Sequence, residues 1–200
     1  MKREDAVSEI LSLVLLLGVV FAISVVVAAV VIPGYTAEKE LQHQTILEDE
    51  FSSLKTGIDF LWLTGTYDTE KQALFSLSAD HTASGKLEVG SRPLAISAEE
   101  GVFSLPVLDI TYGKGNELGC RYVGGALYKG DTLLLSASES PHHSVVVCIE
   151  DSDSFSLYAT EPVSVLYSLK RTVQYHNVSY GGKETNLLTV YYFSVDGGVR

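Results

Sequence analysis

Residues Ile10 to Ile32 read ILSLVLLLGVVFAISVVVAAVVI, an apolar run interrupted only by Ser12, Gly18 and Ser24. As an α-helix this run is ~35 Å long, slightly more than the ~30 Å hydrocarbon core of a bilayer. Each serine hydroxyl can donate to a backbone carbonyl of the preceding turn, so neither serine prevents burial in lipid. A lone segment in lipid satisfies its own backbone hydrogen bonds only as a helix. The run therefore predicts one membrane-spanning helix over residues 10–32, in contact with membrane lipid.

Charges around the run indicate its orientation. Lys2 and Arg3 are the only basic residues before it, and the next one, Lys39, lies beyond it. Because basic residues flank the cytoplasmic end of a span, we expect residues 1–9 inside the cell and residues 66–200 outside. A signal peptide is the alternative, but its apolar centre has ~7–15 residues, followed by a small-residue cleavage site. This run is longer and ends in Val-Val-Ile-Pro-Gly, which favours a span in the cell membrane.

The N-terminus has a recognisable order of features. From Glu4 to Val31 the chain reads EDAVSEILSLVLLLGVVFAISVVVAAVV, in which a short charged leader precedes an Ala-Val-Ser stretch and the apolar run. In this segment it resembles archaeal type IV pilins and their pilin-like relatives. More loosely, residues 119–128, GCRYVGGALY, are similar to the YxGGA strand pair of archaeal pilin-like surface proteins. The resemblance implies a cell-surface protein that assembles through its N-terminal helix into a type IV pilus-like filament.

The leader and Glu9 take their expected roles from this resemblance. In that family a membrane-embedded prepilin peptidase removes the leader, and the helix then packs with those of other pilin-like subunits in homo- or hetero-oligomers. Matched position by position, cleavage here falls between Asp5 and Ala6. Glu9 then has two interpretations. It is a hydrated carboxylate at the headgroup boundary, or, by analogy with bacterial pilins, it pairs with the N-terminal amine of a neighbouring subunit.

Several residues depart from the family pattern. Glu4 and Asp5 stand next to the cut, where a basic or small residue is usual. Glu9 and Ser12 occupy positions where the archaeal pattern often has Pro and Gly. The alternative is therefore a permanently anchored protein that binds the cell envelope, similar in layout to archaellum stator components. An anchored ligand-binding ectodomain is the third hypothesis.

A second helical pattern follows the apolar run. Pro33-Gly34 predicts a break, or at least a kink, at the start of a neck over residues 33–65. Apolar residues then recur at three- and four-residue steps, which predicts an amphipathic helix from about Thr36 to Leu63, ended by Gly65. We expect its apolar stripe to pack on the globular domain, with contact between subunits as the alternative, and Trp62 to be buried. The stripe consists of Leu41, Leu47, Phe51, Leu54, Ile58 and Leu61.

Residues 66–200 change from helical spacing to an alternation of apolar and polar residues. Short runs rich in β-branched and aromatic residues are separated by glycine-containing turns, without a long helical pattern between them. This predicts an antiparallel β-sandwich-like domain, and an α+β fold for the whole chain. Lys129-Gly130-Asp131 marks a hairpin, and Gly124-Gly125 predicts a bulge or a close backbone approach. The expected strands are 74–77, 107–112, 132–135, 144–149, 155–159, 163–175 and 187–195.

The chain carries a formal net charge of −11 over 200 residues. Such a charge repels nucleic acid and anionic lipid headgroups, so neither is expected as a partner. No Gly-x-Ser-x-Gly, Walker, Rossmann or His-Glu-x-x-His motif occurs in the sequence. The sequence therefore indicates a non-enzymatic protein and predicts no catalytic residue, cofactor or metal site.

Two cysteines and one glycosylation pattern lie in the outer domain. Cys120 and Cys148 fall on predicted strands, where an oxidising compartment permits a disulfide. Two buried thiols are the alternative, since free cysteine packs like a small apolar residue. Asn177-Val178-Ser179 fits the N-glycosylation acceptor pattern, and Asn177 would be modified if it is exposed on a cell surface.

Overall fold

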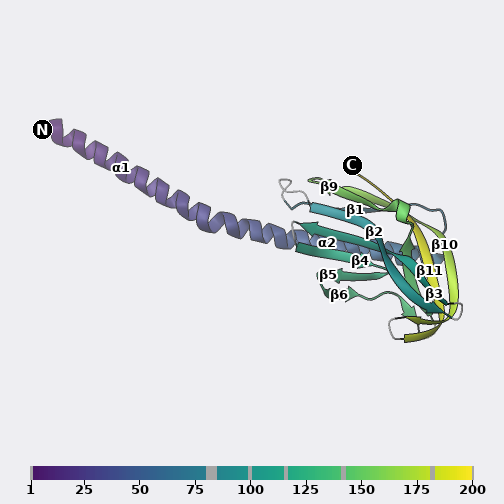
Figure 1. Ribbon diagram of the computed structural model, residues 1–200. Helices are drawn as coiled ribbons and strands as arrows, with labels where there is room; N and C mark the ends of the chain where they lie inside the picture. Colours follow the sequence, from purple (N-terminus) through teal and green to yellow (C-terminus); the bar gives the residue numbers. More distant parts are fainter. Residues whose placement is uncertain are drawn as a thin grey trace. The chain divides into compact units, whose positions relative to one another are not determined.

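The computed structural model describes residues 2–79, 85–98, 101–114, 117–140, 143–180 and 183–199. Helix α1 (Lys2–Val26), a π-helical segment (Val27–Val31) and helix α2 (Ile32–Thr64) follow one another without an intervening loop. The chain forms two compact units, Met1–Gln42 and His43–Arg200, and the boundary between them lies inside α2. Residues 43–65 of the predicted neck therefore belong to the unit that also contains the strands, most of which are labelled in Figure 1.

The helix does not break at Pro33-Gly34, so of the two predicted alternatives, a break or a kink, the break is wrong. Both residues lie inside α2, directly after the π-helical segment. Proline has no amide hydrogen to donate to the carbonyl four residues earlier, here that of Ala29. A π-helical turn shifts the hydrogen-bond partners by one residue, and Ala29 lies within it. The irregularity associated with proline is therefore taken up before Pro33, and the helix continues.

Helix α2 ends where the sequence predicts, at Gly65. Thr64 is its last residue, and Gly65 has a φ of 61°, a left-handed conformation that glycine adopts without strain. The amide of Gly65 donates to the carbonyl of Trp62 at 3.3 Å, and the amide of Thr66 donates to that of Leu61 at 3.1 Å. These two bonds form a Schellman motif, which satisfies carbonyls that the helix end leaves without partners.

Among the described residues, eleven strands form one curled sheet in the order β6-β5-β4-β3-β2-β10-β11-β8-β7, with β1 added to β10 and β9 to β2. Its framework is two long hairpins, β2–β3 and β10–β11 (Figure 1). The sheet bends back on itself, because β3 pairs with β8 at Val107 and Cys148 and β10 pairs with β2 at Ser179 and Ser97. The strands are β1 (Lys71–Phe75), β2 (Gly85–Ala98), β3 (Gly101–Lys114), β4 (Glu117–Val123), β5 (Ala126–Lys129), β6 (Thr132–Leu135), β7 (Glu139–Ser140), β8 (His143–Ile149), β9 (Phe155–Ala159), β10 (Val163–Tyr180) and β11 (Lys183–Val199).

The α+β class is confirmed, but the prediction of an antiparallel sandwich holds only in part. One curled sheet takes the place of two separate layers. Most pairs of strands are antiparallel, but β8 and β11 run parallel from Leu187↔His143 to Phe193↔Ile149. The chain returns between them through β9 and β10 rather than through a helix of the βαβ kind.

The predicted strands overlap observed ones, and two of them, 132–135 and 155–159, agree to the residue. The poorest match is 74–77, which shares only its first two residues with β1. The hairpin at Lys129-Gly130-Asp131 is confirmed and joins β5 to β6. Gly124-Gly125 forms the two-residue turn between β4 and β5 rather than a bulge. The predicted close approach at that turn is confirmed, because a Cβ on Gly124 would lie 2.5 Å from Cγ1 of Val107.

The sequence prediction misses strand β2. Gly90 and Pro93 interrupt its alternation, and both residue types weaken the interior of a strand. In the structure Pro93 lies opposite Pro106 of β3. On its other side β2 pairs with β9 at Gly85–Val89 and with β10 at Ser97, and no described strand covers the part between. A proline is tolerated there because that part of β2 is a free edge.

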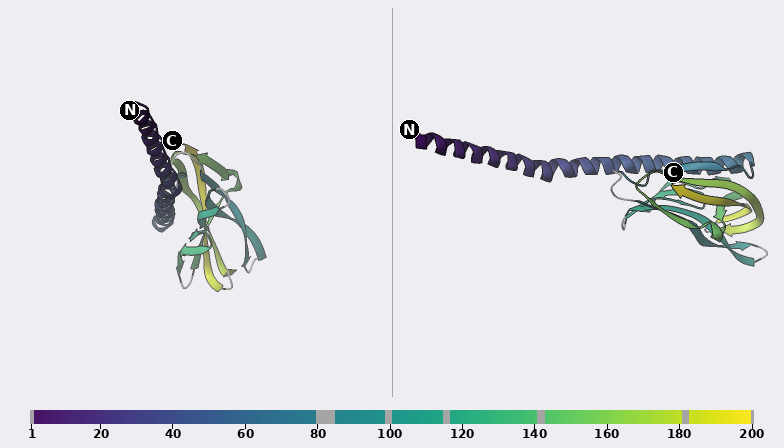
Figure 2. Two further views of the ribbon diagram at one scale, coloured as in Figure 1. Left: turned by 90° about the vertical axis from the view of Figure 1, so that its left-hand side faces the viewer. Right: turned by 90° about the horizontal axis from the view of Figure 1, so that it is seen from above.

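Two hydrophobic clusters fill the unit His43–Arg200. The larger lies between α2 and the sheet, and Figure 2 shows the helix running along the sheet. Strand β8 contributes alternately to both clusters, because successive side chains of a strand point to opposite faces. Val145, Val147 and Ile149 join the larger cluster, whereas Val146 and Cys148 join the smaller one. The sheet is therefore buried on both faces at β8.

Candidate functional site

The apolar segment of the N-terminal helix is exposed along its described length. Ser12–Val30 is long and apolar enough to cross a membrane, and none of it is buried in the unit Met1–Gln42. Its large apolar side chains are 42% to 71% exposed. The hydroxyl of Ser24 donates to the carbonyl of Val20 at 2.9 Å, as predicted. A helix that is apolar on every side needs lipid or other helices around it, so this segment can serve as a membrane anchor or a signal sequence.

The apolar stripe of the neck packs on the sheet, as predicted, except at its first member. Leu41 is 66% exposed and belongs to the other unit. Trp62 is half-buried and packs against Tyr191, with the ring centroids 5.7 Å apart. A Cβ on Gly57 would lie 2.0 Å from Oη of Tyr167, so only glycine lets α2 lie this close to β10. The stripe residues exposed by 1% or less are Leu47, Phe51, Leu54, Ile58 and Leu61.

Acidic side chains fix α2 to the sheet on two sides. Glu48 and Glu50 are two residues apart, so they project from nearly opposite sides of the helix. Glu50 accepts hydrogen bonds from the amide and the hydroxyl of Ser76 at 2.9 and 2.8 Å. Lys129 donates to Glu48. Burial raises the pKa of the Glu50 carboxyl, although the Ser76 bonds act in the opposite direction. The imidazole Nε2 of His43 also donates to the Ser76 carbonyl, at 2.6 Å.

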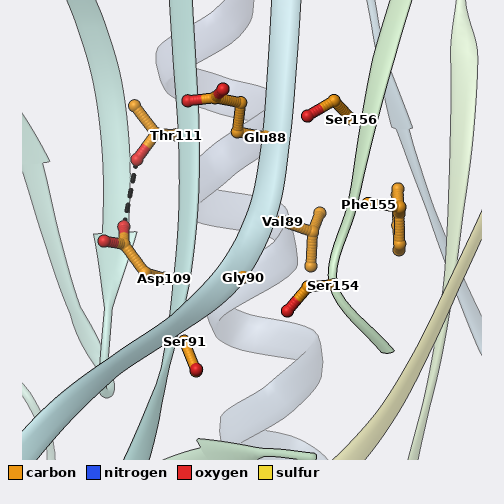
Figure 3. A pocket seen from close by; sticks show the side chains of 9 residues that line it. All are labelled: Glu88, Val89, Gly90, Ser91, Asp109, Thr111, Ser154, Phe155 and Ser156. Carbon is orange, nitrogen blue, oxygen red and sulfur yellow. Dashed lines mark hydrogen bonds between the residues drawn. The ribbon is translucent and has the colours of Figure 1, made fainter. Parts of the chain in front are cut away.

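A concavity of about 390 Å³ lies beside the point where β9 begins to pair with β2 (Figure 3). Gly90, which has no side chain, lies between Asp109 and Ser154 in this hollow. Most of the other lining side chains carry hydroxyl or carboxylate groups, which can bind a hydroxylated ligand. Those polar lining residues are Glu88, Ser91, Asp109, Thr111, Ser154 and Ser156.

The carboxylate of Asp109 is already occupied. Arg121 binds it in a bidentate manner, with Nε 3.0 Å from Oδ1 and Nη2 2.6 Å from Oδ2. Thr111 donates to Oδ1 at 3.0 Å and Arg92 donates from Nε to Oδ2 at 2.6 Å. Burial opposes ionisation, but these bonds hold the pKa of Asp109 below its usual value. Each oxygen accepts two bonds, so Asp109 ties β2, β3 and β4 together and is not available as a base or a ligand.

The two cysteines are free, and both are buried. The disulfide is therefore not formed in this structure, and the alternative of two buried thiols is the one observed. Cys120 on β4 belongs to the larger cluster beneath α2, whereas Cys148 on β8 belongs to the smaller cluster. Burial raises the pKa of Cys120 to about 11, with a further contribution from Glu48, and burial raises that of Cys148 to about 12. Neither thiol forms a reactive thiolate near neutral pH.

Neither a family model, nor a curated protein, nor a solved structure matches this chain.

The other residues singled out in the sequence fall on α1 and β10. Asp5, Ala6 and Glu9 lie on α1, and Asn177 lies on β10, but their side chains are outside the described part of the chain. The described residues contain no group of three or more His, Cys, Asp or Glu that could hold a metal.

Sequence reasoning missed two features. The first is the cluster around Asp109, whose members Arg92 and Arg121 come from neighbouring strands. The second is the exposure of β6: the strand itself was predicted, but not that its three leucines are all exposed. The signal for β6 was present as three consecutive leucines without alternation, Leu133 to Leu135. The Asp109 cluster left no signal, because its residues meet only through strand pairing.

Proposed function

We propose that this chain is a pilin-like cell-surface protein, held in a membrane by its N-terminal helix and assembled through that helix into a pilus-like filament. The single observation that carries the proposal is the continuity of the helical segments. The apolar segment Ser12–Val30 and the stripe that packs on the sheet belong to helical segments with no loop residues between them. A plain anchor or a cleaved signal sequence has no need of such continuity.

The proposed mechanism is assembly and involves no catalytic residue. While the leader is present, lipid covers the apolar segment. After cleavage between Asp5 and Ala6, apolar segments of neighbouring subunits cover one another, and the β-rich domain faces outward. Glu9 then pairs with the N-terminal amine of a neighbour, which neutralises a carboxylate that is costly to place among apolar helices.

The mature N-terminus tests this proposal. Mass spectrometry of the protein isolated from cells that contain a prepilin peptidase should find Ala6 as the first residue. Electron microscopy of the same cells should show filaments that carry the protein. An intact leader that begins with Met1 would overturn assembly through a processed helix.

A charge variant sharpens the test. Glu9→Gln removes the carboxylate without changing the size of the side chain and should reduce the number of filaments. Glu4→Gln is the matched control, because it changes the same residue type in the leader that processing removes. Equal reductions by both variants would show that Glu9 has no special role in assembly.

The second candidate is a permanently anchored envelope-binding protein. The observation that favours it is the pair Glu4 and Asp5 beside the expected cut. This candidate predicts an unprocessed leader and even labelling of the membrane, without filaments.

A further inference from the structure

Strand β6 is an unprotected edge of the sheet. It pairs only with β5, so one side of its backbone has no strand partner among the described residues. Its residues are all exposed, with Leu133 at 51%, Leu134 at 38% and Leu135 at 42%. Edge strands of isolated domains are usually blunted by charges or proline, and Thr132–Leu135 contains neither. One bulge at Leu134 is the only irregularity in its pairing with β5.

The leucines of β6 point to both faces of the sheet. Leu135 lies opposite the buried Leu127, and Leu133 lies opposite Tyr128. Residues opposite each other share a face, and consecutive residues of β5 point to different faces. A strand that is apolar on both faces is typical of the interior of a sheet. What β6 lacks is therefore a neighbouring strand.

A second free edge lies on the other side of α2. β1 pairs only with β10 among the described strands. Its residues Ala73 and Phe75 are buried in the cluster beneath α2, so Leu74, which is 44% exposed, points outward. Glu50 contacts Ser76 next to β1, while Glu48 contacts the β5 end that leads into β6. Figure 1 shows β1 and β6 on opposite sides of α2.

The directions of the two edges can be derived from the pairing. Each step on the path β6-β5-β4-β3-β2-β10-β1 is antiparallel. An even number of antiparallel steps restores the direction, so β1 runs in the same direction as β6. Two copies that stand side by side in the same orientation would therefore bring β6 of one and β1 of the other together as parallel strands.

We propose that β6 of one copy pairs in parallel with β1 of the next copy, so that the sheet continues from subunit to subunit. This inference rests on the proposed function, which places copies of the helix side by side. The contact joins two different surfaces of the same chain, the kind of contact that produces open filaments rather than closed dimers.

The two edges match in their outward apolar side chains. Parallel pairing sets the outward Leu133 beside the outward Leu74, which covers both. In this register the start of β6 lies opposite the middle of β1, with Thr132 beside Ala73. A net charge of −11 disfavours broad contacts between copies of this chain. A narrow strand edge keeps the contact between copies small and so limits that repulsion.

Cysteine cross-linking of the assembled full chain tests the contact. In a Cys120→Ala/Cys148→Ala background, Leu133→Cys is combined with Leu74→Cys. Adjacent strands are ~4.7–4.9 Å apart, within the Cα separation of ~4.4–6.8 Å that a disulfide requires. Oxidation should therefore produce a ladder of linked subunits on a non-reducing gel. Leu133→Cys with Gln72→Cys is the matched control and should give a much weaker ladder.

The outcomes distinguish this inference from the proposed function. Filaments without a ladder would overturn the edge pairing and leave the proposed function standing. A stronger ladder from the Gln72→Cys control would overturn the parallel register. If the unmodified chain forms no filaments, the proposed function fails and the edge pairing fails with it.

A charge on the edge gives an independent measurement. Leu133→Lys should lower the number of filaments on the order of tenfold or more, because an unpaired charge at a strand edge blocks pairing. Val102→Lys is the matched control, since Val102 is 73% exposed on β3 and lies on neither edge. Folding is checked in both variants by the fluorescence of Trp62. A folded Leu133→Lys chain that assembles as well as Val102→Lys would overturn the inference.

Discussion

Replacing Gly57 by alanine measures how closely α2 lies on the sheet. In an exposed helix this change would stabilise the chain by about 1 kcal/mol, because alanine is the better helix former. Here the new Cβ would lie 2.0 Å from Oη and 3.2 Å from Cζ of Tyr167. Tyr167 is 5% exposed, so its ring has little room to move away. Overpacking of this kind costs about 1–3 kcal/mol, so after the gain in helix propensity we expect the free energy of unfolding to fall by up to about 2 kcal/mol.

A second substitution isolates the contact. Tyr167→Phe removes Oη and leaves only the contact with Cζ at 3.2 Å, which a shift of a few tenths of an ångström would relieve. In the Tyr167→Phe background, Gly57→Ala should therefore change the free energy of unfolding by less than about 0.5 kcal/mol, or stabilise the chain. Tyr167→Phe alone is the control for the loss of the hydroxyl.

Trp62 provides the assay. It is the only tryptophan of the chain and packs against Tyr191, so its fluorescence follows the separation of α2 from the sheet. Urea unfolding of the full chain in detergent micelles gives the free energy of each variant. A stabilising Gly57→Ala in the presence of Tyr167, or equal effects in both backgrounds, would show that α2 does not lie against β10 at this point.

Three further predictions concern the core, the Asp109 cluster and the thiols. Ile58 is buried, so Ile58→Ala should lower the free energy of unfolding by about 2–5 kcal/mol, whereas Ile46→Ala at a half-exposed position should lower it by about 0.5 kcal/mol or less. Equal losses of the two variants in urea unfolding would refute the assigned faces of α2. The pKa of Asp109 is lower in the folded chain than in the unfolded chain, where it is ~3.9. The stability that Asp109 contributes should therefore be fully present above the unfolded pKa and lost as the pH falls through the folded pKa. Asp109→Asn should therefore lower the free energy of unfolding by about 1–3 kcal/mol at neutral pH. The free energy of the variant should also fall less steeply in acid, and a pH dependence of stability equal to that of the unmodified chain would contradict this. Cys120 and Cys148 should resist maleimide near neutral pH until urea is added, and a gel shift on reduction would instead reveal a disulfide.

Local patterns predicted the helical part of the chain well. The spacing from Leu47 to Leu61 depends only on the geometry of one helix, and Gly65 depends only on the conformation of one residue. Leu41 belongs to the same periodic stripe but is exposed. Periodicity identifies a face of a helix, but it does not say along how much of the helix that face has a partner. The helix across Pro33 was missed for a different reason, because a π-helical turn is not visible in the pattern of side chains.

Contacts between distant strands were the least predictable part. The apolar and β-branched residues of β8 and β11 indicate that each is a strand but carry no information about their relative direction, so their parallel pairing was not foreseen. The cysteines illustrate the same limit. Their placement on strands was correct, but whether Cys120 and Cys148 can meet depends on which side of the sheet each one faces. That is fixed by register, and register depends on the whole sheet.

The apolar segment Ser12–Val30 and strand β6 have one property in common. Each is apolar on all its sides, and within a single chain each remains exposed. A bilayer would cover the first, but in a permanently anchored monomer β6 would still face water with an unpaired edge. Neighbouring copies would cover both at once, the helix by other helices and β6 by a neighbouring β1. This is why we favour a filament over a solitary anchor, and why the two tests of assembly are directed at these two elements.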